Sequence, residues 1–279
     1  MSSILTNSSA VVALQTLKGI NSNLSKTQNE ISTGKTINNA KDNAALWSIA
    51  KTMEIDQSSA STIQKNLNVA SETVGTARVG AENIMTALQD ISKLILSANS
   101  SDKPFATIQT QIDQKKAQIT SIISTTQTNG VNLLSTNGVN GGATYTVLSS
   151  MDRAGTAITP AYINVASVDF EANLDLTTLT AITDQATAAT ALTDLQALIT
   201  TAQTGIAALG ASGSRIADQS DFIGKLGDSL KLGVSALVDA DMEESSARLQ
   251  ALQTQQQLGI QALSIANQAP SAILSLFRG

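Results

Sequence analysis

The chain of 279 residues contains neither cysteine nor histidine. Without cysteine, disulfide bonds, thiolate metal ligands and cysteine nucleophiles are all excluded. Without histidine, the chain lacks the commonest general base, the usual zinc ligand and a Ser-His-Asp triad. No carboxylates are grouped at metal-ligand spacing either. We therefore predict that the protein is not an enzyme and that it uses no cofactor and no metal.

Aromatic residues, charged residues and long apolar runs are also scarce. Aromatics make up 3% and charged residues 14% of the chain, against about 25% charged residues in ordinary soluble proteins. The net charge is −5, so the chain has no excess of positive charge to bind the phosphates of a nucleic acid. No run approaches the roughly 18 apolar residues of a membrane span. Residues 1–13 lack the positively charged start of a cleaved signal peptide. We expect no nucleic-acid partner and no membrane partner.

Apolar residues recur at alternating steps of four and three over residues 49–98, which predicts one long helix with a narrow apolar seam. Asp56 is the one polar member of the seam. The stop signal around Asp102 and Pro104 ends this helix. The seam positions are Ile49, Met53, Asp56, Ala60, Ile63, Leu67, Ala70, Val74, Ala77, Ala81, Ile84, Leu88, Ile91, Ile95 and Ala98.

Two further stripes predict helices that can cover this seam. A shorter one carries Ile108, Ile112, Ile119 and Ile123 and ends before Asn129-Gly130. A longer one runs from Leu192 to Leu237, and the positions of this stripe that are not apolar carry small residues. Helices that each carry a single narrow apolar stripe can bury these stripes against one another in an antiparallel bundle. The predicted fold class is mainly α, a long antiparallel helical bundle or coiled coil with a small β-hairpin region.

The hairpin is expected where the helical pattern stops. Residues 144–148 and 162–170 alternate with a period of two, and turn signals such as Asn137-Gly138 precede them. We expect strands here that cap the end of the bundle. Thr144, Thr146 and Ser149 are candidate glycan sites, although ordinary strand and turn chemistry also explains them.

The two ends of the chain carry seams of their own. Near the start, Leu17, Leu24 and Ile31 are seven residues apart. The far end carries Leu249, Leu252, Leu263 and Ile273, out of phase with the preceding stripe by one residue. The slip falls near residues 238–242 and predicts a domain boundary inside a continuous helix. We predict that these seven apolar residues mediate self-assembly.

The last thirty residues supply a second reason to expect self-association. Residues 249–277 carry no charged side chain but seven glutamines. A solvated helix would carry charges on its outer face, and a membrane span would not carry seven glutamines. A helix covered by other copies of the chain explains the pattern, because amides can pair where charges are costly to desolvate. The alternative is a glutamine-rich amphipathic tail that is loose in solution.

Three motifs in both ends of the chain resemble bacterial flagellin. They are ISTGKTINNAKDNAA at residues 31–45, DADMEESSA at 239–247 and ANQAPSAILSLF at 266–277. The resemblance is strong over residues 1–100 and 190–279 and weak over 130–180. It implies a structural subunit that is secreted and self-assembles into the helical filament of the bacterial flagellum for motility.

The resemblance also implies an arrangement of domains and a set of partners. In flagellins the paired termini line an inner tube, and the internal helices form an outer tube. The implied boundaries are 1–40 and 238–279 for the inner tube, 41–129 and 179–237 for the outer tube, and 130–178 for the hairpin and surface loops. The implied partners are further copies of the chain, the hook-associated junction and cap proteins, the export chaperone and the export apparatus.

Burial of a Leu or Ile contributes about 1.5–3 kcal/mol, whereas ordering the backbone costs about 1–2 kcal/mol per residue. Neither end carries enough apolar residues to fold alone. We therefore expect residues 1–34 and 240–279 to be disordered in the monomer and helical in the polymer.

Two other readings of the pattern remain open. A hook–filament junction protein would resemble flagellin at both ends without forming a long polymer. An unrelated coiled-coil scaffold would also show heptads, although such proteins are usually rich in Glu and Lys beside the seam.

Overall fold

A computed structural model describes residues 7–100, 104–154 and 157–276 of the chain. These residues form six helices and one antiparallel two-stranded sheet. They divide into two compact units, one holding the residues up to Asp56 and from Ser229 onward, the other spanning Gln57–Asp228. The elements are α1 (Ser8–Thr33), α2 (Ala44–Ser97), α3 (Phe105–Thr125), β1 (Thr144–Ala154), β2 (Ala157–Ala166), α4 (Phe170–Asn173), α5 (Gln185–Val238) and α6 (Met242–Leu276).

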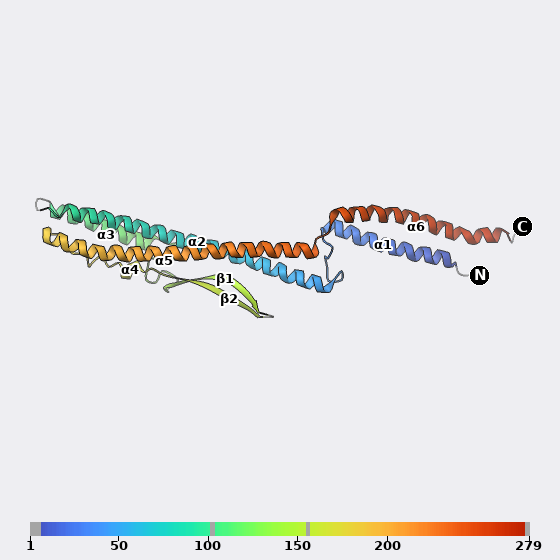
Figure 1. The fold of residues 1–279 in the computed structure, drawn as a ribbon, viewed down its shortest axis with the longest axis horizontal. Helices are drawn as coiled ribbons and strands as arrows, with labels where there is room; N and C mark the ends of the chain where they lie inside the picture. The colour runs from blue at the N-terminus through green and yellow to red at the C-terminus, as the bar shows by residue number, and fades with distance from the viewer. Residues whose placement is uncertain (1–6, 101–103, 155–156, 277–279) are drawn as a thin grey trace. The chain divides into compact units, whose positions relative to one another are not determined.

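Within the Gln57–Asp228 unit, α2 and α5 run antiparallel along each other (Figure 1). Ser220 Oγ of α5 donates a hydrogen bond to Asn68 Oδ1 of α2 at 3.0 Å. Further along, a Cβ at Gly213 would lie 3.7 Å from Val74 Cγ1. The predicted seam of α2 is confirmed from Ala60 to Ala98, because every one of its positions in that stretch is buried.

The seam prediction is wrong at its first position. The Ile49 side chain is 51% exposed, whereas Ala50 is buried in a small cluster with Ile37 and Val238. The reason is that α2 changes its neighbours before Gln57. There it contributes to the other unit, whose apolar residues meet a different face of the helix.

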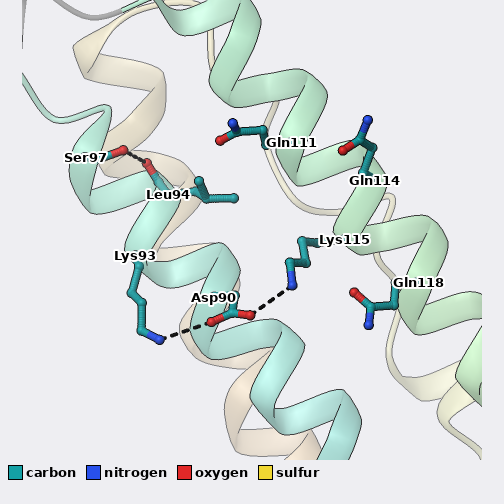
Figure 2. A pocket seen from close by; sticks show the side chains of 8 residues that line it. All are labelled: Asp90, Lys93, Leu94, Ser97, Gln111, Gln114, Lys115 and Gln118. Carbon is teal, nitrogen blue, oxygen red and sulfur yellow. Dashed lines mark hydrogen bonds and ion pairs between the residues drawn. The ribbon is translucent and has the colours of Figure 1, made fainter.

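Helix α3 closes the third side of the bundle as predicted, with Ile108, Ile112, Ile119 and Ile123 all buried. At the surface between α2 and α3, Asp90 accepts hydrogen bonds from Lys115 at 2.9 Å and from Lys93 at 3.1 Å (Figure 2). These two hydrogen bonds, that from Lys115 first, hold the pKa of Asp90 below its ordinary value of 3.8.

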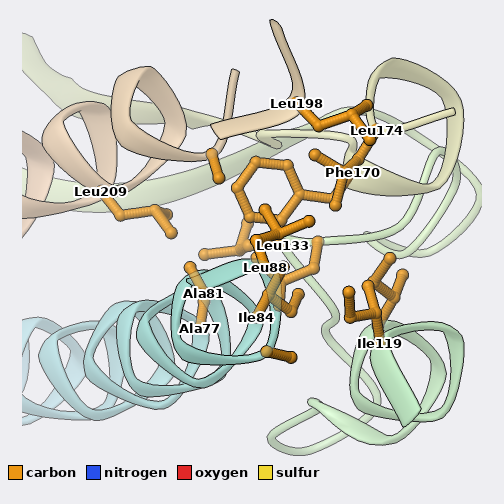
Figure 3. Close-up of a cluster of buried hydrophobic side chains, with 14 of the residues drawn as sticks. Ala77, Ala81, Ile84, Leu88, Ile119, Leu133, Phe170, Leu174, Leu198 and Leu209 are labelled. Carbon is orange, nitrogen blue, oxygen red and sulfur yellow. The ribbon is translucent and has the colours of Figure 1, made fainter. Parts of the chain in front are cut away.

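The segment after α3 contributes one buried aromatic ring to the core. Phe170 is fully buried, with Leu88, Leu133 and Leu174 around it (Figure 3). The sequence pattern placed Phe170 at the end of a strand, which is wrong, because it begins the short helix α4. Asp169 ends the strand pattern there: its backbone is left-handed, with φ 49°, and its side chain accepts a hydrogen bond from Ala172 N.

The predicted hairpin is confirmed, but its strands are longer than expected and its position is different. Strands β1 and β2 pair from Thr144↔Ala166 to Ala154↔Ala157. Val147, Ile163 and Val165 are buried against the helices, and Gln219 Nε2 donates to Ser149 O at 3.0 Å. Because Gln219 lies well inside α5, the hairpin packs along the side of the helices (Figure 1). The expectation that it caps the end of the bundle is wrong.

Gly205 of α5 lies where the backbone of the helix must approach the residues around Phe170 closely. A Cβ built on Gly205 would lie 2.3 Å from Val168 Cγ1 and 2.6 Å from the Phe170 ring. Neither neighbour is the mobile end of a long side chain. Glycine is therefore required at this position, although it lowers the helix propensity of α5.

We predict that Gly205→Ala destabilises the Gln57–Asp228 unit by about 1–3 kcal/mol, because overpacking forces Val168 and Phe170 to shift. Urea unfolding followed by circular dichroism measures the change. Gly75→Ala is the matched control: Gly75 lies in α2 with no atom within 4 Å of a Cβ there, so alanine raises stability by up to about 1 kcal/mol. Equal effects of the two substitutions would contradict the packing described here.

Candidate self-assembly surface

The two ends of the chain meet as an antiparallel pair of helices, α1 and α6 (Figure 1). Asn7 Nδ2 donates to Ala266 O at 2.7 Å near one end of the pair. Gln256 Nε2 donates to Asn21 Oδ1 at 2.7 Å further along. Gly259 lies between these two bonds, where a Cβ would be 3.2 Å from Leu17 Cδ1 and 3.7 Å from Ile20 Cδ1.

The seven residues predicted to mediate self-assembly lie on these two helices. Leu252 is buried at 7% exposure, and its partners in the seam are only half-buried. The register of the pair brings Leu24 level with Leu252. The half-buried residues are Leu17, Leu24, Ile31, Leu249 and Leu263; the side chain of Ile273 lies outside the described residues. These residues therefore follow the seam inside the pair, and their role between copies of the chain stays a prediction.

A second set of apolar residues on the same helices points to solvent, and the sequence pattern missed it. In α6, Leu258 is 58% exposed and Ile265 is 70% exposed. They are seven residues apart and follow Ala251 by the same spacing, so they form a stripe beside the inner seam. A search for a second apolar heptad would have found this signal. The exposed set on both helices comprises Val11, Val12, Leu14, Met242, Leu258, Ile260 and Ile265.

The surface around these residues is almost free of charge. Helix α6 has no charged side chain after Arg248. Helix α1 carries Lys18, Lys26 and Glu30, and Glu30 is buried beside Lys26, with Nζ and Oε1 3.9 Å apart. An exposed apolar stripe without charges costs little to desolvate, so a partner surface of the same composition can cover it.

A hydrogen-bonded turn connects the pair to the rest of its unit, and it is formed by the motif at residues 31–45. Thr36 N donates to Val238 O at 2.7 Å, and Ala240 N donates to Gly34 O at 2.9 Å. Gly34 ends α1 in the left-handed conformation with φ 68°, which glycine adopts without strain. The two linkers of the pair are thus joined by backbone hydrogen bonds.

The helix expected to continue through residues 238–242 is interrupted. Helix α5 ends at Val238 and α6 begins at Met242. Asp241 Oδ1 accepts hydrogen bonds from Glu243 N at 2.9 Å and Glu244 N at 3.1 Å, so it caps the new helix. The expectation of a continuous helix is wrong, because the backbone of Asp239 and Ala240 pairs with the turn at Gly34.

An ion-paired carboxylate supports this turn. Lys51 Nζ lies 2.6 Å from Glu54 Oε2, and Lys35 Nζ lies 3.3 Å from Glu54 Oε1. The hydrogen bond from Lys51, with a smaller contribution from Lys35, holds the pKa of Glu54 below its ordinary value of 4.5. The stabilisation is therefore present above that ordinary value and is lost as the pH falls through the lowered pKa.

Other kinds of site are not formed by the part of the chain that the structure describes. Over residues 7–100, 104–154 and 157–276, no cluster of three or more Asp or Glu residues could hold a metal ion. In the same ranges no helix is both long enough and apolar enough to cross a membrane.

Comparison with known proteins finds one family at both ends of the chain. Residues 4–138 match the bacterial flagellin N-terminal helical region, and residues 192–277 match the C-terminal helical region. The chain is 42% identical to a flagellin of Brucella melitensis, with both chains covered in full. It is 36% identical to flagellin FljK of Caulobacter vibrioides, over all of this chain and 99% of the other. It is 31% identical to flagellin A of Rhizobium meliloti over 395 aligned positions and the full length of both.

We predict that Gly34→Ala weakens the turn by about 1 kcal/mol, because alanine is strained at a positive φ. Trp47 is the only tryptophan of the chain and packs against the cluster of Ile37, Ala50 and Val238. Its fluorescence during urea unfolding therefore reports on this unit.

Gly19→Ala is the control, because Gly19 lies inside α1 with nothing within 4 Å of a Cβ there. We expect it to leave the Trp47 transition in place. A transition that shifts equally to lower urea in both variants would refute the role given to Gly34.

Proposed function

Because the chain belongs to the bacterial flagellin family and is a structural subunit of the flagellar filament, we propose that its α1–α6 pair supplies the contacts that lock neighbouring subunits together. Flagellins are structural proteins and not enzymes, and as a filament component this chain is extracellular. Relatives that match it over their full length carry the name flagellin. The alternatives of a junction protein and an unrelated coiled-coil scaffold are not favoured.

The observation that carries this proposal is the exposed, uncharged apolar surface of the pair. Leu258, Ile265 and Val12 are each more than half exposed, although burying such side chains contributes about 1.5–3 kcal/mol each. A subunit that remained a monomer would lose this free energy. In a homopolymer every copy offers the same surface, so the copies can cover one another.

The proposed division of labour separates the α1–α6 pair from the helices between its two ends, with boundaries that lie inside the unit holding residues up to Asp56 and from Ser229 onward. Residues 1–40 and 238–279 form the inner tube of the filament, and the helices between them form the outer tube around it. Support comes from the contrast between the pair, in whose described part Leu252 is the one buried apolar residue, and the bundle of α2, α3 and α5, which has a fully buried core. Residues 130–178 carry the hairpin on the side of that bundle.

The outer surface of the filament is proposed to be smooth. The alignment with flagellin A of Rhizobium meliloti extends over 395 positions, so that relative carries long segments that this chain of 279 residues lacks. The segment between the two family regions, residues 139–191, is short in this chain and contains the hairpin, α4, a connecting segment and the start of α5.

Partners other than copies of the chain belong to the proposal as well. The hook-associated junction and cap proteins would bind the α1–α6 pair at the two ends of a filament, because the terminal subunits there lack neighbours that cover the exposed stripe. The export chaperone and export apparatus would bind the same ends before assembly, when these residues are unpaired.

We predict that the two ends order only on assembly. In the isolated monomer, backbone amides of residues 8–33 and 242–268 exchange rapidly, while those at Leu67, Ile84 and Ile119 are protected by the bundle core. In filaments both sets are protected. Hydrogen exchange with mass spectrometry on the two states measures this, and slow exchange of the ends in the monomer would disprove the coupling.

We also predict that replacing Leu258 and Ile265 together by serine blocks filament growth. Loss of about 1–2 kcal/mol for each half-exposed side chain corresponds to a rise in critical concentration on the order of a hundredfold. Seeded polymerisation followed by light scattering gives the critical concentration. Gln257→Ser, an exposed polar position of the same helix, is the control and should leave growth unchanged. A double variant that grows like the unaltered chain would remove the basis of the proposal.

A further inference from the structure

Three Asn-Gly pairs lie within the loop that follows α3, and neither assembly nor the core explains their number. They are Asn129-Gly130, Asn137-Gly138 and Asn140-Gly141. All three asparagines are exposed. Asn-Gly is the dipeptide in which the backbone nitrogen of the second residue most readily attacks the amide carbon of the first, because glycine has no side chain to hinder the approach.

The backbone holds the first of these pairs in a conformation that prevents the attack. Asn129 and Gly130 have φ 51° and 80°, and two hydrogen bonds between Thr128 and Val131, of 3.0 and 2.9 Å, close the turn. This is a type I′ hairpin turn. With ψ near +47° in the left-handed region, the next nitrogen lies on the far side of the Cα–C bond from the Asn side chain, so the ring cannot close.

The third pair is held in the same way. Asn140 and Gly141 have φ 51° and 82°. Hydrogen bonds from Gly142 N to Val139 O at 2.8 Å and from Val139 N to Gly142 O at 3.2 Å close this second turn. In addition, Gly141 N donates to Asn137 O at 3.2 Å, which engages the nitrogen that would have to attack.

The middle pair lacks the left-handed turn that holds the other two. Asn137 is not left-handed, and among the described residues no acceptor is bonded to Gly138 N. The pair is held through its two carbonyl oxygens, by a 3.2 Å bond from Gly141 N to Asn137 O and a 2.7 Å bond from Asn132 N to Gly138 O, and neither bond engages the attacking nitrogen. We infer that Asn137 is a site of spontaneous deamidation in the folded protein, and that the type I′ turns protect Asn129 and Asn140, which share its dipeptide.

The reaction needs water alone. Gly138 N forms a bond to Asn137 Cγ and loses its proton, while the bond from Cγ to Nδ2 breaks and the nitrogen leaves as ammonia. Water then opens the resulting succinimide at either carbonyl. Opening at the side-chain carbonyl gives aspartate, and opening at the main-chain carbonyl gives isoaspartate.

Either product disturbs a crowded, acidic part of the loop. The adjacent Thr136 already donates to Asp169 Oδ1 at 2.7 Å and to Glu171 Oε2 at 3.2 Å, so deamidation adds a third negative charge one residue away from a group that binds two carboxylates. Isoaspartate also lengthens the backbone beside Gly138, where even a Cβ would lie 2.0 Å from Asn132 O. The modification therefore loosens the segment that places Leu133 and Leu134 in the core.

The test follows the three amides separately in the full-length chain. The protein is incubated in mildly alkaline buffer, folded or unfolded in urea, and digested for peptide mass spectrometry, with enzymatic methylation to reveal isoaspartate. In the folded chain Asn137 should lose its amide severalfold faster than Asn129 and Asn140, and in urea all three should react at similar rates. Asn137→Gln should abolish the modification, because attack of Gly138 N on the longer glutamine side chain would have to form a larger ring.

Three results would overturn the inference. The first is that Asn129 or Asn140 reacts as fast as Asn137 in the folded chain. The second is that Asn137 keeps its amide in the folded chain while all three react in urea. The third is that the differences persist unchanged in urea, because that would show that neighbouring sequence and not the turns controls the rates.

Discussion

The structure of this flagellin depends on a shortage of apolar partners at the two ends of the chain. Helices α1 and α6 pack against each other along one narrow seam. In the described part of the pair, Leu252 is the one apolar residue that is buried. Pairing the two helices leaves Leu258 and Ile265 mostly in water. Two helices have only one interface between them, so pairing alone leaves a second apolar stripe exposed.

In the bundle of α2, α3 and α5, the apolar residues are covered by other parts of the same chain. Its seam on α2 is covered by two other helices and by the segment around Phe170, so that the positions from Ala60 to Ala98 are all buried. A subunit built from both kinds of structure has one part whose core is complete within the chain and one part that keeps an exposed apolar stripe. The turn at Gly34 and the cap at Asp241 mark where the pair begins, because there the backbone bonds to itself across the two linkers.

The sequence predicted those helices and strands that bury one face at regularly spaced positions. The seam of α2, the four isoleucines of α3 and the existence of the hairpin could be read from spacing alone, because one face of each element meets the core. The prediction failed at Ile49, where α2 meets a different set of neighbours, and at Phe170, where a left-handed Asp169 ends the strand pattern. The strand residues 157–162 are all exposed, so no alternation of burial marks their extent. The exposed stripe of α6 was missed because the inner seam, one residue away from it, accounted for the heptad.

The most direct test of the central claim is to remove the two helices and measure filament growth. A chain without residues 1–33 and 242–279 retains every buried residue of the bundle core, which circular dichroism can confirm before the assay. Added to filament seeds at concentrations where the complete chain elongates, it should give no growth under electron microscopy. Filaments of normal length built from the truncated chain would contradict the account, because the subunits would then be joined without the surface to which it assigns that role.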